Sequence, residues 1–210
     1  MPRKNLIRQS QFPYHVYIRT TNKDWFKIPM YRMWELCFEC LEYALDKENV
    51  VIHAFVLMSN HYHLLVTTPE SNLDKFMEHF NRRLSKKINQ EAKMQNHKFA
   101  NRYKWTIVGT RSYLFNIYRY IYQNPIRAGL CQRCIDYPYT SLRFSPSQLR
   151  ILGIKVHLNY FEYRQWMEER GGCEFEDVIR KGLNKSHFEI NSKTRVGIQK
   201  LLKTVPAKYL

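Results

Sequence analysis

The chain has 210 residues, of which 44% are hydrophobic, and is rich in aromatics (15 Tyr, 12 Phe, 4 Trp), a composition that can form a packed core and excludes a disordered chain. Lys and Arg number 34 against 18 Asp and Glu, a net charge of +16, which favours a polyanionic partner: nucleic acid first, an anionic membrane surface second. No apolar run approaches the roughly 18 residues of a spanning helix, and residues 1–11 lack the apolar centre of a signal peptide, so we expect a soluble intracellular protein without a membrane partner.

The first part of the chain alternates between strand and helix patterns. Residues 13–20 alternate and are rich in β-branched and aromatic side chains, which predicts a strand. Apolar residues recur at helical spacing over 29–46. Residues 49–58 predict a buried strand, and Ser59-Asn60 predicts a tight turn into a partner strand over 61–67.

A long amphipathic helix follows, capped by Ser71 or Asn72. Its apolar stripe consists of Leu73, Phe76, Met77, Phe80, Leu84 and Ile88. Residues 103–109 predict a fourth strand, and 112–124 predict a helix that Pro125 ends. The order β-α-β-β-α-β-α predicts an α+β fold, a ferredoxin-like antiparallel sheet with helices on one face, the strand over 61–67 in its middle and the other face open for a ligand.

The pattern becomes helical beyond about Arg143. Helices are predicted over 148–152, 160–169, 174–181 and 192–203. We therefore predict a first domain over 1–143 and a helical C-terminal extension over 144–210.

The five cysteines do not form a secreted disulfide framework, because their number is odd and their positions are scattered. Two pairs, Cys37 with Cys40 and Cys131 with Cys134, have a spacing that could supply four thiolates to a structural zinc ion. Cys37 and Cys40 also fit an apolar helical pattern, which favours a place in the core.

His61 and His63 lie on the strand predicted over 61–67. Residues i and i+2 of a strand point to the same face, so the two imidazoles are expected side by side. As neutral ligands they could hold a divalent cation and leave coordination positions for oxygen ligands and substrate. The alternative is a pair of inert histidines hydrogen-bonded within a sheet. His53 is expected to be a buried structural histidine.

Tyr120 and Asn124 are i and i+4 on the predicted helix, one turn apart on one face. A phenol with a pKa of about 10 is a poor nucleophile unless something assists its deprotonation or polarises the electrophile. A cation bound to a phosphate oxygen can polarise the electrophile. The alternative is that Tyr120 and its tyrosine neighbours are only the aromatics of an amphipathic helix.

Five segments occur in an order that resembles the motifs of single-tyrosine HUH transposases: HAFVLM, NHYHLL, NRYKW, YIYQNPIRAGL and DYPYTSLR. Within that class the chain is most similar to the REP-associated tyrosine transposases and their insertion-sequence relatives. The resemblance covers roughly residues 11–145. It departs from the family pattern at Ser59, where a proline is common, and in NHKFANRYKW, which lacks a glycine often found near its start.

The resemblance implies that His61 and His63 are metal ligands, that Asn124 is the third, and that Tyr120 is the nucleophile. The resemblance also implies that Mg²⁺ or Mn²⁺ assists cleavage of single-stranded DNA. In this reaction the tyrosine would form a 5′-phosphotyrosine link and leave a free 3′-OH. A second strand end would then reverse the link. Residues 1–143 would then be the HUH single-tyrosine catalytic domain. The expected partner is single-stranded DNA that forms hairpins, and the expected location is the bacterial cytoplasm or nucleoid. The sequence does not decide whether the protein forms a homodimer.

Positive charge gathers over residues 75–111, which hold ten Lys and Arg against two Glu. A path for DNA phosphates would use Arg82, Arg83, Lys86, Lys87, Arg102, Lys104 and Arg111. The alternative is a solvated helix face. Trp105 could stack on an unpaired base but fits better in the core.

Two rival functions stay open. A relaxase or replication initiator would commonly carry a third histidine or paired tyrosines, and the short chain and the motif order argue against it. A catalytically silent DNA- or RNA-binding regulator with the same fold would bind hairpins without forming a covalent adduct on Tyr120.

Overall fold

The computed structural model describes residues 5–94, 99, 102–154, 160–169 and 173–188. At its centre is an antiparallel sheet with the strand order β2-β3-β1-β4. The strands are β1 (Tyr14–Arg19), β2 (Val51–Leu57), β3 (His61–Thr67) and β4 (Lys104–Ile107). The histidine strand β3 therefore lies in the middle, and the ferredoxin-like order confirms the predicted α+β fold class.

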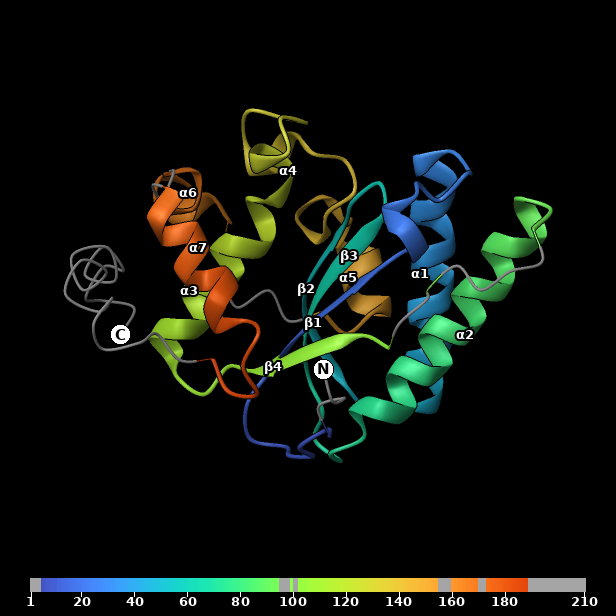
Figure 1. Ribbon diagram of the computed structural model, residues 1–210, viewed down its shortest axis with the longest axis horizontal. Helices are drawn as coiled ribbons and strands as arrows, with labels where there is room; N and C mark the ends of the chain where they lie inside the picture. Colours follow the sequence, from blue (N-terminus) through green and yellow to red (C-terminus); the bar gives the residue numbers. More distant parts are fainter. Residues whose placement is uncertain (1–4, 95–98, 100–101, 155–159, 170–172, 189–210) are drawn as a thin grey trace.

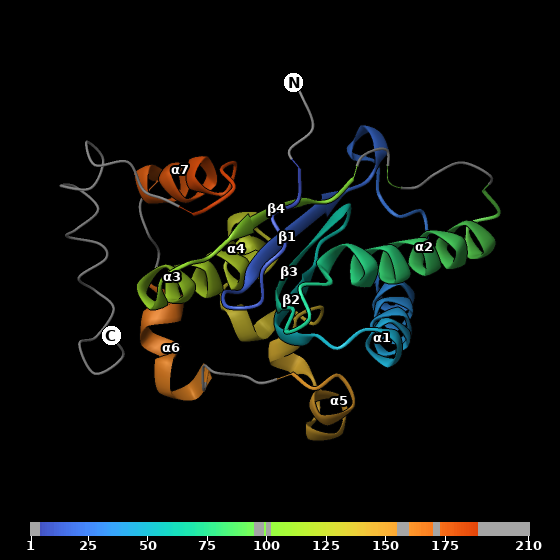
Figure 2. The same ribbon diagram turned by 90° about the horizontal axis from the view of Figure 1, so that it is seen from below.

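One face of the sheet packs against α1 (Met30–Lys47) and α2 (Leu73–Glu91), which lie together on one side in Figures 1 and 2. Alternate strand residues such as Val16 and Leu64 point into this first core and are fully buried. The whole predicted apolar stripe of α2 is buried there as well. The short α5 (Pro146–Ile151) joins the same core through Leu149.

The other face of the sheet is only partly open, so the expectation of an open face is wrong in part. It is covered by α3 (Arg111–Tyr122), α4 (Asn124–Arg127), α6 (Tyr160–Glu168) and α7 (Cys173–Gly182), with α3, α6 and α7 opposite α1 and α2 in Figure 1. Leu65 of β3, Ile121 of α3, Met167 of α6 and Ile179 of α7 share a second buried core. The described C-terminal helices thus complete the fold of residues 1–143, because the apolar second face needs cover.

Helix ends differ from the sequence prediction at two points. α3 begins at Arg111, because the hydroxyl of Thr110 accepts a hydrogen bond from the Tyr113 amide at 3.2 Å. Pro125 does not break the helical path, since it lies in the first turn of α4, where proline is tolerated. The helix predicted over 192–203 lies outside the described residues.

Candidate active site

A cavity of about 660 Å³ lies on the second face of the sheet, and we call it the histidine cavity. β1 contributes His15, Tyr17 and Arg19 to its wall, and β3 contributes His61 and His63. These residues share one face because strand side chains alternate, and the register places Tyr17 opposite His63 and Arg19 opposite His61. The side-by-side arrangement of His61 and His63 is therefore confirmed, with ring centroids 5.2 Å apart.

His63 is buried and shares a hydrogen bond with a third histidine, His15. The bond joins His63 Nδ1 and His15 Nε2 over 2.9 Å. A proton held on Nδ1 by this bond leaves His63 Nε2 with a free lone pair, which is the form that binds a metal. Burial lowers the pKa of His15 to about 3 and holds the pKa of His63 well below its ordinary value. Both rings are therefore neutral near pH 7, as metal ligation requires.

His61 is held by the residue before it. Its Nδ1 lies 2.7 Å from Asn60 Oδ1, while Asn60 Nδ2 donates to the Lys23 carbonyl at 2.7 Å. Because the Asn60 amide nitrogen donates to the Lys23 carbonyl, the amide oxygen faces the imidazole and accepts a hydrogen bond from its Nδ1–H, which leaves His61 Nε2 free. Burial, and then the charge of Arg19, lower the pKa of His61 to about 3.

Tyr120 reaches the histidines from α3. Its ring centroid lies 5.8 Å from that of His63 and 6.1 Å from that of His15, with both imidazoles nearly perpendicular to it. Burial raises the pKa of Tyr120 above its ordinary value, while Arg127 and Arg180 oppose that shift. The predicted nucleophile and the predicted histidine pair therefore line one cavity of one chain.

Asn124 lines the same cavity, one helical turn beyond Tyr120. Gln123 keeps helical dihedrals (φ −83°, ψ −5°), so the helical path runs from α3 into α4. Asn124 Nδ2 donates to the Tyr120 carbonyl at 2.9 Å. The amide oxygen, the atom that would bind a cation, is therefore the branch turned away from that carbonyl.

The residues present fit a divalent cation. His61 and His63 each keep one ring nitrogen free, and Asn124, which lines the same cavity, carries an amide oxygen. Within the described part of the chain, no three His, Cys, Asp or Glu side chains are arranged around a common metal position. A cation here would therefore need the amide oxygen, or oxygen atoms from substrate and water.

The described cysteine pairs do not come together. Cys37 and Cys40 lie in α1 in the first core, whereas Cys134 lies in the second core on the opposite face of the sheet. Burial raises the pKa of each of these three thiols, which keeps them protonated. This placement favours the interpretation of Cys37 and Cys40 as core residues.

Among the cavity residues that were not assigned a role from the sequence are His15, Arg127, Glu176 and Arg180. The Arg127 guanidinium lies 4.4 Å from the Tyr120 ring centroid, donates to the Tyr120 carbonyl at 2.6 Å and lies 3.8 Å from the Glu176 carboxylate. Local signals could have identified two of these residues. His15 alternates with Tyr17 along one strand, and Arg127 lies one helical turn beyond Asn124. Glu176 and Arg180 come from α7, and no local pattern ties that helix to the cavity.

The predicted DNA-contacting residues separate into two groups on α2. Arg82 and Lys86, with Arg102, line a hollow of about 900 Å³ along α2, which we call the α2 groove. Arg83 lies over the Tyr43 ring of α1, 4.2 Å from its centroid.

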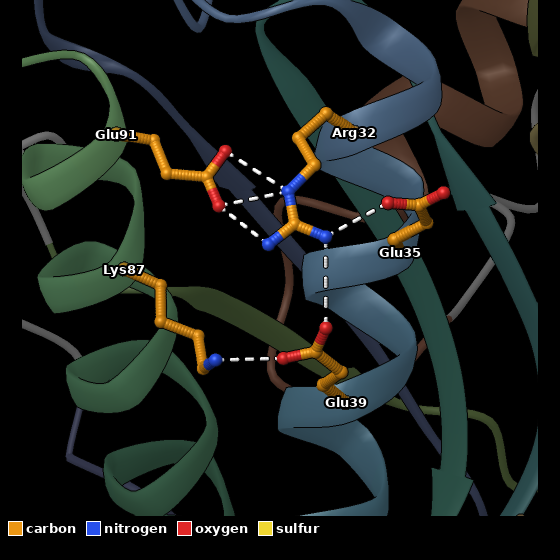
Figure 3. Close-up of polar contacts among 5 residues, drawn as sticks. All are labelled: Arg32, Glu35, Glu39, Lys87 and Glu91. Carbon is orange, nitrogen blue, oxygen red and sulfur yellow. Dashed lines mark hydrogen bonds and ion pairs between the residues drawn. The ribbon is translucent and has the colours of Figure 1, made fainter.

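Lys87 also faces α1, where it pairs with Glu39 at 2.6 Å. Figure 3 shows that Arg32 extends this contact into a network between α1 and α2. Lys104 lines the histidine cavity itself. Arg111 is the first residue of α3, and its side chain lies outside what the structure describes.

The structure confirms the predictions that His53 is a buried structural histidine and that Trp105 belongs to the core. His53 is 7% exposed, and its Nε2 lies 2.7 Å from Thr67 Oγ1. Trp105 is 5% exposed and packs edge-on against Tyr14 in the first core.

Comparison with protein families identifies the class to which this fold and cavity belong. The family model described as "Transposase IS200 like" matches residues 8–124, more than half of the chain. The chain therefore belongs to the IS200-like transposases, enzymes of DNA cleavage and transfer.

Among solved structures, one of a REP-associated tyrosine transposase bound to a REP hairpin is similar. It has a TM-score of 0.53 and 18% sequence identity, over 67% of this chain and 82% of that chain, and it shows the same fold. A search of curated proteins finds no significant match. Among the described residues, no helix is long and apolar enough to cross a membrane.

Proposed function

We propose that the chain cleaves and rejoins single-stranded DNA next to hairpins, through a 5′-phosphotyrosine link on Tyr120 and with the help of a divalent cation. The observation that carries the proposal is the meeting of Tyr120, His63 and Asn124 in one cavity. The family supports the reaction class, and the hairpin-bound relative supports the kind of DNA. The natural place for this chemistry is the bacterial cytoplasm or nucleoid, where such DNA is found.

Each group in the cavity has a defined task in this proposal. His61, His63 and Asn124 would hold Mg²⁺ or Mn²⁺, which would polarise the scissile phosphate and stabilise charge on its oxygens. Tyr120 Oη forms a bond to phosphorus, its proton passes to water, and the bond from phosphorus to the 3′ oxygen breaks. The departing oxygen takes a proton from water and becomes the free 3′-OH. The link conserves the energy of the phosphodiester, so a second 3′-OH can reverse it.

Arg127 lowers the cost of charging the nucleophile. Its guanidinium lies 4.4 Å from the Tyr120 ring centroid in a largely buried position, where a positive charge favours phenolate over phenol. Arg180 opposes the effect of burial in the same way. Both cations also line the cavity, where they would stabilise charge on phosphate oxygens.

Tyr120 meets the histidines of its own chain, so we propose that cleavage occurs in cis. A homodimer stays a prediction. A dimer that exchanged its tyrosine helices would have to withdraw α3 from the second core, where Ile117 and Ile121 are fully buried.

The test is adduct formation on a denaturing gel. The protein is incubated with a labelled single-stranded oligonucleotide library carrying hairpins, with Mn²⁺ or Mg²⁺, and compared with Tyr120→Phe and Tyr118→Phe. Tyr118 is a matched control, because it lies on the same helix but is 2% exposed and faces the second core. We expect an adduct that EDTA and Tyr120→Phe abolish and Tyr118→Phe retains. Hairpin binding without any adduct would favour the silent regulator instead.

A further inference from the structure

A second hollow lies beside the histidine cavity, at the edge of the sheet where β1 ends. β4 pairs with β1 as far as Tyr17, opposite Lys104, whereas β1 continues to Arg19. The end of β1 left uncovered by β4 borders a hollow of about 520 Å³, which we call the edge hollow. Its charged lining consists of Arg19, Lys23, Arg102 and Lys104, and none of the described residues that line it is acidic.

The edge hollow lies next to the histidine cavity and shares part of its wall. Tyr17, Arg19 and Lys104 line both spaces, and Arg102 is shared with the α2 groove on the other side. The Nε atom of Arg19 is buried and has no hydrogen-bond partner among the described residues. A buried guanidinium nitrogen without a partner is costly, and Arg19 lines both hollows, where an anionic oxygen can bind its guanidinium.

The loop that carries Lys23 is fixed to the turn before His61. The Thr20 amide donates to the Asn60 carbonyl at 2.9 Å, and Asn60 Nδ2 donates to the Lys23 carbonyl at 2.7 Å. Asn22 and Lys23 both adopt left-handed conformations, with φ of 54° and 61°. Such backbone strain in residues with side chains is uncommon and concentrates at functional sites.

We propose that the edge hollow is a DNA subsite, which holds backbone phosphates of the single strand that leads into the histidine cavity. The proposal rests on the proposed function, since it requires a single-stranded substrate. Cations that neutralise phosphates supply most of the sequence-independent affinity for DNA.

The experiment measures binding of a fluorescent oligothymidylate by anisotropy over a series of salt concentrations, in EDTA. The subsite variant combines Lys23→Asn with Arg102→Gln, because asparagine tolerates the left-handed backbone at position 23. The matched control combines Arg83→Gln with Lys87→Gln. It removes the same charges from the side of α2 that faces α1.

We expect the subsite variant to bind more weakly, with a log–log salt slope lower by about 1.4, since each lost phosphate contact on single-stranded DNA lowers the slope by about 0.7. The control should keep the wild-type slope. Equal losses in both variants would show a general charge effect, and an unchanged slope in the subsite variant would show that no phosphate binds there; either result would overturn the proposal. Because binding in EDTA needs neither cation nor cleavage, a failure of the proposed chemistry would appear only in the adduct assay.

Discussion

Replacement of His15 by phenylalanine tests whether the buried pair of histidines prepares a metal site. His15 is 4% exposed, and its Nε2 lies 2.9 Å from His63 Nδ1. Phenylalanine fills the space but removes the hydrogen-bond partner. His63 is then free to carry its proton on Nε2, the nitrogen that would bind the cation.

The expected magnitudes follow from that single bond. Loss of a partner beyond a ligating histidine lowers metal affinity by about 10- to 100-fold, or about 1.4 to 2.7 kcal/mol. The buried Nδ1 of His63, left without a hydrogen-bond partner, lowers the free energy of unfolding by about 1–3 kcal/mol. Isothermal titration with Mn²⁺ measures the first effect, and urea unfolding measures the second.

His53→Phe is the matched control for this measurement. His53 is also a buried histidine on a strand of the same sheet, but its Nε2 lies 2.7 Å from Thr67 Oγ1 and it does not line the histidine cavity. The His53→Phe variant should have a lower free energy of unfolding, while its Mn²⁺ affinity stays at the wild-type value. If folded His15→Phe bound Mn²⁺ within about twofold of wild type, or if both variants lost affinity equally, the positioning role of His15 would be refuted.

Two further predictions concern the turn and the core. Asn60→Ala removes the oxygen that faces His61 and the hydrogen bond to the Lys23 carbonyl. The Mn²⁺ affinity measured by titration should therefore fall by about tenfold or more. An unchanged affinity would mean that His61 needs no support from Asn60. Leu64→Ala leaves a void on the central strand, where Leu64 is fully buried against the first core, and urea unfolding should show a loss of about 2–5 kcal/mol. A loss below about 1 kcal/mol would contradict the packing described between the sheet, α1 and α2.

Much of the site was predictable because its signals are local. Alternation along a strand places His61 and His63 on one face whatever the rest of the chain does. Helical spacing places Asn124 one turn beyond Tyr120, and α4 preserves that relation through Gln123. These are short-range geometric consequences of backbone conformation, and the structure agrees with them.

The charged residues of α2 were harder to assign from the sequence. Arg82, Arg83, Lys86 and Lys87 all lie off the apolar stripe, so periodicity groups them together. Only the position of α1 separates them: Arg83 and Lys87 turn to Tyr43 and Glu39, while Arg82 and Lys86 line the α2 groove.

The sequence by itself determined the strands, most helix positions, the ferredoxin-like class and the residues of the histidine pair and the tyrosine turn. Tertiary structure alone decided that His15 bonds to His63 and that α7 brings Glu176 and Arg180 to the cavity. Contacts of this second kind join segments far apart in the chain. They depend on sheet register and on which helices cover the second face, because the need to bury apolar surface acts on the whole fold and not on any one segment.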